Sequence, residues 1–170
     1  VTRARRRRSD RQQIRCHIRF LIRADMPEVL EIERLSFEQP WEEKDFFKSL
    51  RERNCLGMVA EYYFGPKEES PPVVGFMLYE LLKEQIHIIN IAVHPDYRRC
   101  EVGSQMVSKL KDNRSACRRG LITADPDETN LSAHLFFKSQ KFRATEVLRN
   151  FYTHEDGKTR DAYHMEYKLQ

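Results

Sequence analysis

The sequence predicts an α/β (α+β) fold whose strands and helices follow the order β-α-α-β-β-β-α-β-α-β-β. An apolar, β-branched run at 85–93 ends before Pro95 and leads through a basic turn into a helical pattern over 102–110, as in a strand, loop and helix. Two further apolar runs, 55–64 and 73–82, flank a polar, proline-rich loop and predict an antiparallel hairpin. A chain of 170 residues suits one domain with one core.

The elements before the hairpin are a strand and two helices. Residues 17–23 alternate between apolar and polar side chains, as a strand does. Asp25 is a suitable N-cap for the first helix, and Glu28 occupies the capping-box position. Pro40 cannot continue that helix, so a second helix is expected over 42–53.

The elements after the central helix alternate again. That helix is expected to end near Gly120, because glycine readily takes the left-handed conformation that terminates helices. A short strand at 121–125 and a helix at 130–140 follow, and strands at 142–152 and 161–168 close the chain. The residues expected to share one face of the helix at 130–140 are Leu131, Leu135, Phe136 and Ser139.

The composition excludes a membrane protein and gives no sign of a metal site. Hydrophobic residues make up 40% and charged residues 33% of the chain, and no apolar run approaches the ~18 residues of a membrane span. The four cysteines form no Cys-x-x-Cys pair, and the six histidines lack the spacing of metal ligands. We therefore expect free thiols, a reducing cytoplasm and no bound metal.

The positive charge is concentrated at the N-terminal end. Residues 1–15 hold seven arginines and one aspartate, a net +6, so the remainder carries −2 of the total +4. This composition predicts a disordered tail over 1–15, with the folded domain over 16–170. The alternative is that the tail contacts RNA weakly by neutralising phosphates.

The junction between the fourth strand and the following helix is predicted to bind phosphate. The first turn of a helix has N–H groups without an intrahelical partner and carries the positive end of the helix dipole, so an anion is stabilised there. Arg98 and Arg99 add positive charge, and Val102, Gly103 and Ser104 form the first turn.

This junction resembles the acyl-coenzyme A loop of the GNAT N-acetyltransferases. Their pattern, Arg/Gln-x-x-Gly-x-Gly/Ala, falls on Arg98, Glu101 and Gly103, and the element order is also theirs. The resemblance covers most of residues 18–169. It implies a twisted, mixed, mostly antiparallel sheet flanked by helices, and acetyl-CoA as the co-substrate.

Further motifs are similar to those of the RimI-type N-terminal acetyltransferases, which modify the N-terminal alanine of a ribosomal protein. They are Ile32-Glu33, Pro40-Trp41-x-Glu43-Lys44-x-Phe46, Asn90-Ile-Ala-Val-His-Pro-Asp-Tyr97, Arg149-Asn-Phe-Tyr152, Asp156-Gly157 and Asp161-Ala162. The resemblance implies an acceptor that is a protein or peptide N-terminus, such as that of a ribosomal protein. Trp41, Phe151 and Tyr152 would line the acceptor site.

The same resemblance assigns roles around the fourth strand. In this fold the strand separates from its neighbour, so Ile91, Ala92 and Val93 would pair with the pantetheine and direct an N–H at the thioester carbonyl. Asn130 matches a family landmark beside the cofactor. Asp125, five residues earlier, stands where RimI-type enzymes have a glutamate and would act as the base.

Three residues depart from the family pattern. Glu101 replaces a glycine that can take a positive φ beside the pyrophosphate, which predicts weaker cofactor binding. Phe137 replaces a tyrosine thought to protonate the leaving thiol, with a core aromatic as the alternative interpretation. Asp125 is shorter than glutamate, and just before Pro126 it is equally suited to capping a turn.

Two other functions stay open at this point. A degenerate domain that binds a peptide, RNA or an acyl-coenzyme A without turnover would accommodate Glu101 and Phe137. An acetyltransferase for small amines would need an acidic cleft, whereas an aromatic slot built from Trp41, Phe151 and Tyr152 favours a peptide N-terminus.

Overall fold

The computed structural model describes residues 14–63, 70–116, 119–153 and 157–168, and the element order within them is the predicted one. Most of the predicted tail, residues 1–13, and the segment around Asp156 lie outside the described residues. The elements are β1 (Cys16–Phe20), η1 (Arg23–Asp25), α1 (Met26–Ser36), α2 (Glu43–Leu50), β2 (Cys55–Tyr62), β3 (Val73–Leu81), β4 (Gln85–Val93), η2 (Pro95–Tyr97), α3 (Val102–Ala116), β5 (Leu121–Ala124), α4 (Leu131–Ser139), β6 (Arg143–Thr153) and β7 (Thr159–Lys168).

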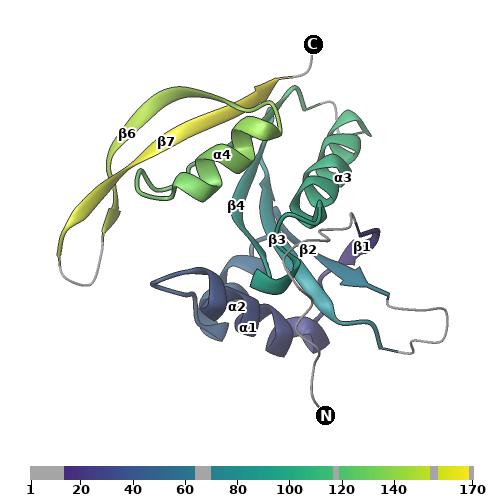
Figure 1. The fold of residues 1–170 in the computed structure, drawn as a ribbon. Coiled ribbons are helices and arrows are strands. Elements are labelled where there is room, and N and C mark those ends of the chain that lie inside the picture. Colours follow the sequence, from purple (N-terminus) through teal and green to yellow (C-terminus); the bar gives the residue numbers. More distant parts are fainter. Residues whose placement is uncertain (1–13, 64–69, 117–118, 154–156, 169–170) are drawn as a thin grey trace.

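The seven described strands form one sheet in the order β1-β2-β3-β4-β5-β7-β6 (Figure 1). The pair β4 and β5 is parallel and the other pairs are antiparallel, so the predicted mixed, mostly antiparallel sheet is confirmed. A parallel pair requires a crossover connection, and α3 supplies it between β4 and β5.

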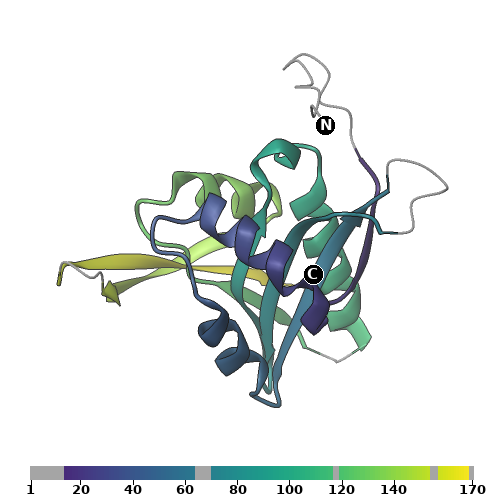
Figure 2. The same cartoon turned by 90° about the horizontal axis from the view of Figure 1, so that it is seen from below.

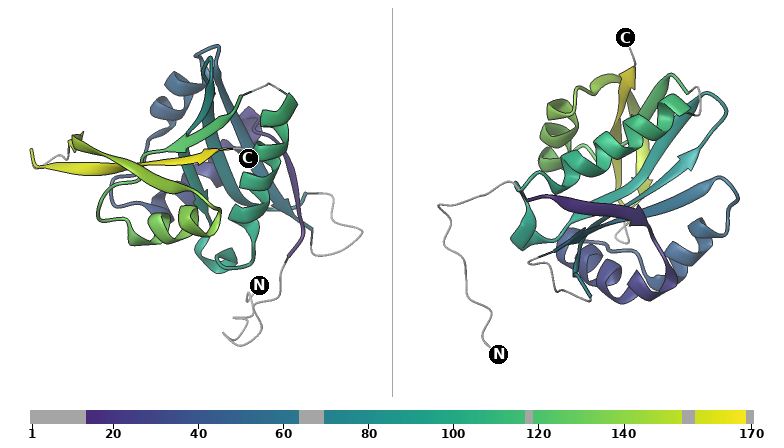
Figure 3. Two further views of the ribbon diagram at one scale, coloured as in Figure 1. Left: turned by 90° about the horizontal axis from the view of Figure 1, so that it is seen from above. Right: turned by 90° about the vertical axis from the view of Figure 1, so that its right-hand side faces the viewer.

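Helices cover both faces of the sheet, and the sheet separates the core into two halves (Figures 1 and 3). On one face, Ile32 of α1 and Phe46 of α2 are buried against β2 and β3. On the other face, Met106 and Leu110 of α3 and Phe137 of α4 are buried against the sheet. No helix in the described part of the chain is long and apolar enough to cross a membrane.

The strands differ in how far they are covered. β3 is buried along 73–79, which explains why its sequence is almost continuously apolar. β6 is exposed along most of its length, and the β6–β7 hairpin extends away from the helical layers (Figure 2). This hairpin therefore borders the sheet centre on one side and solvent on the other.

Strands β4 and β5 separate at the middle of the sheet, as predicted. Their pairing ends at Ile88 and Ala124, and in the described part of the chain β4 continues to Val93 without a β5 partner. At the same point Ile89 is an extra residue opposite β3, which makes a β-bulge and bends the strand. One backbone edge of β4 is therefore open to a ligand.

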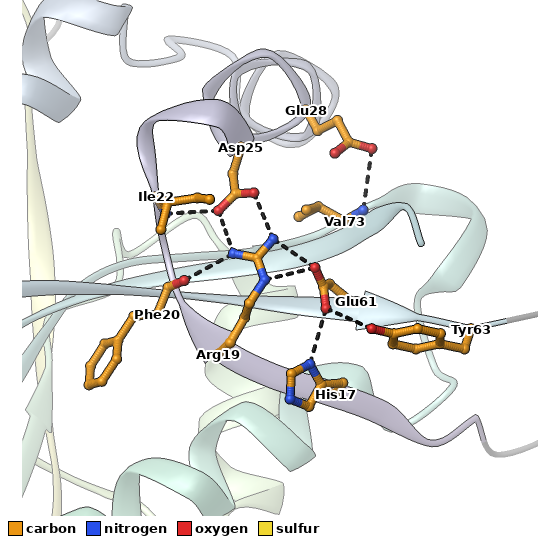
Figure 4. A network of polar contacts seen from close by, with 9 residues as sticks. All are labelled: His17, Arg19, Phe20, Ile22, Asp25, Glu28, Glu61, Tyr63 and Val73. Carbon is orange, nitrogen blue, oxygen red and sulfur yellow. Dashed lines mark hydrogen bonds and ion pairs between the residues drawn. The ribbon is translucent and has the colours of Figure 1, made fainter. Parts of the chain in front are cut away.

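The predicted N-terminal cap of the first helix is wrong in its contacts. Asp25 does precede α1, but its carboxylate accepts hydrogen bonds from the Arg19 guanidinium at 2.7 and 2.8 Å and from the Ile22 N–H at 2.8 Å (Figure 4). Glu28 accepts from the Val73 N–H at 3.3 Å and does not complete a capping box. The Arg19 guanidinium binds both carboxylate oxygens, and this bidentate, charge-assisted pair holds Asp25 toward β1.

The predicted face of α4 is not the one that packs on the sheet. Leu131 and Leu135 are 66% and 59% exposed, whereas Phe137 is 3% exposed and lies in the core. The helix is apolar around most of its circumference, so periodicity does not single out one face.

Candidate active site

Asp125 follows directly after β5, where β4 and β5 separate. Its side chain is only 11% exposed, and its two oxygens face histidines from two other strands. Nδ1 of His164, on β7, lies 2.5 Å from Oδ1, and Nε2 of His87, on β4, lies 3.7 Å from Oδ2. An ionised carboxylate only accepts hydrogen bonds, so Nδ1 of His164 donates to Asp125.

Burial lowers the pKa of His87, against the opposing effect of the Asp125 and Glu80 carboxylates. Its other ring nitrogen, Nδ1, lies 2.9 Å from Oγ1 of the fully buried Thr123. His87 is therefore held in one orientation and stays neutral to a lower pH than an exposed histidine.

Sequence reasoning missed both histidines. Ala124 pairs with Met165 in the antiparallel β5–β7 ladder, so Asp125, which follows Ala124, comes opposite His164, which precedes Met165. That register depends on β7 lying beside β5, and strand order is not visible in local periodicity. The usable signal was the Asp161-Ala162 motif, which anchors β7 to a known family.

The carboxylate of Asp125 does not cap the turn that follows it. Asp127 does so instead, accepting from the Thr129 N–H at 2.8 Å through its side chain and from the Asn130 N–H at 2.9 Å through its backbone. Asn130 then caps α4, its Oδ1 accepting from the Ala133 N–H at 3.0 Å.

Tyr152 is joined to Asp125 through the backbone. Its hydroxyl donates to the Asp125 carbonyl at 2.6 Å. Burial, together with the negative charges of Asp125 and Asp127, raises the pKa of Tyr152 to about 12, so the phenol stays neutral. Phe151 packs against Tyr152 with ring centroids 5.0 Å apart and is 49% exposed. Of the three predicted acceptor residues, Tyr152 therefore contacts Asp125, and Phe151 contacts Tyr152.

The third predicted acceptor residue, Trp41, lies on the α1–α2 side. Its ring packs edge-on against Phe46 at 5.4 Å, and among the described residues no ring contact joins it to Phe151 or Tyr152. The predicted aromatic slot is therefore not closed by ring contacts. Trp41 borders a cavity of about 360 Å³ with Asp45, Lys48, Ser49, Glu52 and Glu80.

Glu33 connects the Trp41 segment to β4. It is 1% exposed and accepts from the Trp41 N–H at 2.9 Å and from Nδ2 of Asn90 at 3.1 Å. Burial raises the pKa of Glu33, and these two hydrogen bonds reduce the rise. Sequence reasoning quoted Glu33 only as part of a family motif and assigned it no role.

The loop after β4 contains the predicted arginines and Glu101. Arg98 donates to the Val93 carbonyl at 3.0 Å and to Oγ of Ser36 at 2.9 Å, so it ties the end of β4 to α1. Arg99 and Glu101 have positive φ angles of 61° and 66°, and both side chains are exposed. Glu101 thus adopts the conformation for which the family uses glycine.

The side chains of the first turn of α3 serve packing. A β-carbon on Gly103 would lie 2.9 Å from the Phe136 ring, so only glycine allows α4 to approach this closely. Val102 is buried, and Oγ of Ser104 accepts from Nε2 of Gln140 at 3.0 Å. The backbone N–H groups of this turn are what an anion would bind.

Phe137 is a core aromatic. Its ring lies 5.3 Å from that of Phe136 and 5.1 Å from that of Phe142. Lys141, just before Phe142, has a φ of 69°.

The described cysteines form no disulfide, and the described part of the chain has no cluster of metal-ligand side chains. Cys16, Cys55 and Cys100 are free thiols, and burial raises the pKa of Cys16 and Cys55 to about 11. Cys117 lies outside the described residues. Within the described ranges no group of three or more His, Cys, Asp or Glu side chains has an arrangement that holds a metal ion.

Comparison with known proteins gives consistent results. The chain is 27% identical to the [ribosomal protein bS18]-alanine N-acetyltransferase of Escherichia coli K12 over 136 residues, which are 79% of this chain and 85% of that protein. The crystal structure of the E. coli ribosomal-protein-S18-alanine N-acetyltransferase has a TM-score of 0.75 at 23% identity and covers 92% of this chain and 95% of its own. Arabidopsis thaliana NAA60 with a bisubstrate analogue has a TM-score of 0.77 at 17% identity, over 92% of this chain and 99% of its own.

The family itself follows from the sequence profile. The profile of the Acetyltransferase (GNAT) family matches residues 26–142, which run from α1 to the residue before β6 and include the β4–β5 separation, the first turn of α3 and Asp125. The chain therefore belongs to the acetyltransferase (GNAT) family.

Proposed function

We propose that this protein transfers the acetyl group of acetyl-CoA to the N-terminal α-amine of a protein, with residues 16–170 as the catalytic domain. The observation that carries the proposal is Asp125 at the β4–β5 separation, with Tyr152 bonded to its carbonyl. The two E. coli proteins compared above support a protein acceptor, because they are named as alanine N-acetyltransferases of a ribosomal protein. A ribosomal protein is the acceptor we propose.

The open edge of β4 and the first turn of α3 fit the two ends of an acyl-coenzyme A. In this proposal, the backbone at Ile91, Ala92 and Val93 pairs with the pantetheine. The N–H groups of Val102, Gly103 and Ser104 hold the pyrophosphate, with the Arg98 and Arg99 charges and Asn130 beside them. Acetyl-CoA supplies an acetyl group activated as a thioester.

The fit is imperfect at one position. The exposed carboxylate of Glu101 stands beside the proposed pyrophosphate site, where a like charge weakens binding. Its backbone already has the φ of the family glycine, so the turn itself keeps its shape.

Asp125 acts as the base in this mechanism. It accepts a proton from the ammonium group, whose ordinary pKa is about 7.7–8.0. The freed nitrogen attacks the thioester carbonyl carbon, and a β4 N–H stabilises the oxyanion. The C–S bond then breaks, and the nitrogen loses its second proton to solvent. Phe137 has no proton to give, so the thiolate takes one from water, which its ordinary pKa of about 8.5 permits.

Transfer to peptides that begin with alanine or serine tests this function. Mass spectrometry should show one added acetyl group at the α-amine, and Asp125→Asn should slow the reaction by about 10²–10⁴-fold. Asp112→Asn is the matched control, because Asp112 is an exposed residue on α3. Acetylation of polyamines but not of peptides would instead assign the small-amine function, and binding of acetyl-CoA without any transfer would assign a binding domain.

A further inference from the structure

Asp125 is held at two points by residues of the β6–β7 hairpin. Tyr152 fixes its backbone carbonyl, and His164 binds its side chain at 2.5 Å. Among the described residues, the bond to His164 is the only hydrogen bond of the Asp125 carboxylate. His87 faces the other oxygen at 3.7 Å, which is too long for a direct hydrogen bond.

We propose that His164 is a positioning residue, which holds the Asp125 carboxylate by Oδ1 so that Oδ2 is presented to the amine. The proposal rests on the proposed function, because it gives His164 a role only in that reaction. It adds a residue from β7 to a site otherwise built from β4, the end of β5, the first turn of α3 and Tyr152 of β6.

The short side chain of Asp125 gives such a residue a role. The side chain of Asp125 is one methylene shorter than a glutamate, so its reach into the β4–β5 separation depends on its rotamer. A charge-assisted hydrogen bond of 2.5 Å selects one rotamer. A displacement of the base by about 1 Å costs on the order of a hundredfold in rate, so this selection has a measurable kinetic effect.

The charged groups around the His164–Asp125 contact are consistent with a fixed Asp125 carboxylate. The far nitrogen of His164, Nε2, lies 3.7 Å from Oε1 of Glu166, and Lys168 lies 3.1 Å from the other oxygen of Glu166. Both ring nitrogens of His164 therefore face carboxylates. From β3, Glu80 acts on His87, which stands across from Oδ2.

The alternative is that His164 only stabilises the seam between β5 and β7. Three substitutions separate the two roles. His164→Leu removes the donor, and His164→Thr removes it with a β-branched residue that suits a strand. His164→Asn keeps an N–H near the position of Nδ1 but does not titrate near neutral pH.

The measurements are kcat and KM for an alanine-terminated peptide, with the acetyl-CoA dissociation constant and the thermal midpoint. We expect His164→Leu and His164→Thr to lower kcat by about 10–100-fold, with KM and the dissociation constant changed by less than about threefold. His164→Asn should recover most of the loss. Tyr163→Phe is the control, because Tyr163 is the neighbouring β7 residue and packs against His134.

A double-mutant cycle separates an effect of His164 on the Asp125 carboxylate from a general effect on folding. In an Asp125→Asn background His164→Thr should lower kcat no further, because its effect passes through the Asp125 carboxylate. An unchanged kcat in His164→Thr, additive losses in the double variant, or an Asn variant as slow as the Leu variant would each overturn the positioning role. A parent protein that acetylates no peptide overturns the proposed function and this role together, whereas an active parent with unaffected His164 variants overturns this role alone.

Discussion

Glu101 is a non-glycine residue in the left-handed region, with φ at 66°. A side chain with a β-carbon pays about 1–2 kcal/mol for this conformation. Because the residue is exposed, its charge is screened by water and salt, but it still lies beside the proposed anion site. Glu101 therefore has two separable effects: its β-carbon strains the backbone at positive φ, and its carboxylate places a negative charge beside the proposed anion site.

Glu101→Gly is expected to tighten acetyl-CoA binding, because it removes a like charge and also the β-carbon, which lets the backbone approach the pyrophosphate more closely. Glu101→Gln removes the charge alone and should give part of the gain. Calorimetric dissociation constants at low salt measure both effects, and the advantage of Gln should shrink as ionic strength approaches about 0.15 M. Equal affinities for parent and both variants would mean that the anion binds elsewhere.

At the scale of elements, one arginine joins three segments at the N-terminal corner of the sheet (Figure 4). Arg19 of β1 binds Asp25 of η1 and, at 2.7 Å, Glu61 of β2, whose other oxygen lies 3.1 Å from Nδ1 of His17. Burial raises the pKa of both Asp25 and Glu61. Hydrogen bonds from Arg19 and the Ile22 N–H at Asp25, and from His17 and Arg19 at Glu61, outweigh burial and leave both pKa values below the ordinary range.

Arg19→Met should destabilise the fold by about 3–5 kcal/mol near neutral pH, because it removes the cationic partner that two buried carboxylates share. Both carboxyl groups have lowered pKa values in the folded protein, so their contribution is present above the ordinary pKa and is lost as the pH falls through the folded values. The difference between parent and variant should therefore narrow below about pH 4. Urea unfolding across pH measures it.

The control for this experiment is Lys44→Met. Lys44 and Glu42 form an ion pair whose side chains are 74% and 69% exposed. Exposed pairs contribute little, so this variant should unfold at the midpoint of the parent. A difference between parent and Arg19→Met that is independent of pH would show that lost packing, and not the carboxylates, causes the destabilisation.

A second prediction at this scale concerns the connection of Trp41 to β4 through Glu33. Glu33→Ala leaves the Trp41 N–H and the Asn90 amide without their acceptor, at a cost of about 1–3 kcal/mol for each buried group. Trp41 is the only tryptophan in the chain, so its fluorescence should shift to longer wavelength as the segment loosens. Glu31→Ala, at an exposed position of the same helix, should leave the emission unchanged.

At the scale of the whole molecule, the proposed donor site joins elements from across the chain. The open edge of β4 lies at the centre of the sheet, α3 begins beside it, and α4 packs against the first turn of α3 through Phe136 and Gly103. A ligand that spans these elements is bound only by the folded protein and therefore stabilises it.

Acetyl-CoA at about 100 times its dissociation constant should stabilise the fold by about 2.7 kcal/mol. For a chain of this size each kcal/mol raises the thermal midpoint by about 2–4 °C, so a rise of roughly 5–11 °C is expected. Differential scanning calorimetry measures the midpoint. Adenosine monophosphate, which lacks the pantetheine, is the control ligand and is added at the same concentration as acetyl-CoA. An equal shift with both ligands would contradict binding along β4.

The prediction of the elements succeeded where the signal was local. The bounds of β4, 85–93, were predicted without error, because a β-branched run between polar turns is visible in a short window. The separation of β4 from β5 came from the family resemblance. The face of α4 and the contacts of Asp25 failed for the opposite reason: several local patterns were acceptable, and only distant partners chose between them.

The sequence by itself determined the order of strands and helices, the basic turn before α3 and the carboxylate at the end of β5, because each depends on residues that are close together in the chain. Only the tertiary structure decided what surrounds that carboxylate. His87 and His164 reach Asp125 because β4 and β7 both pair with β5. Strand order follows from the packing of the whole sheet, and no short segment encodes it. The partners of the proposed base are therefore a property of the fold.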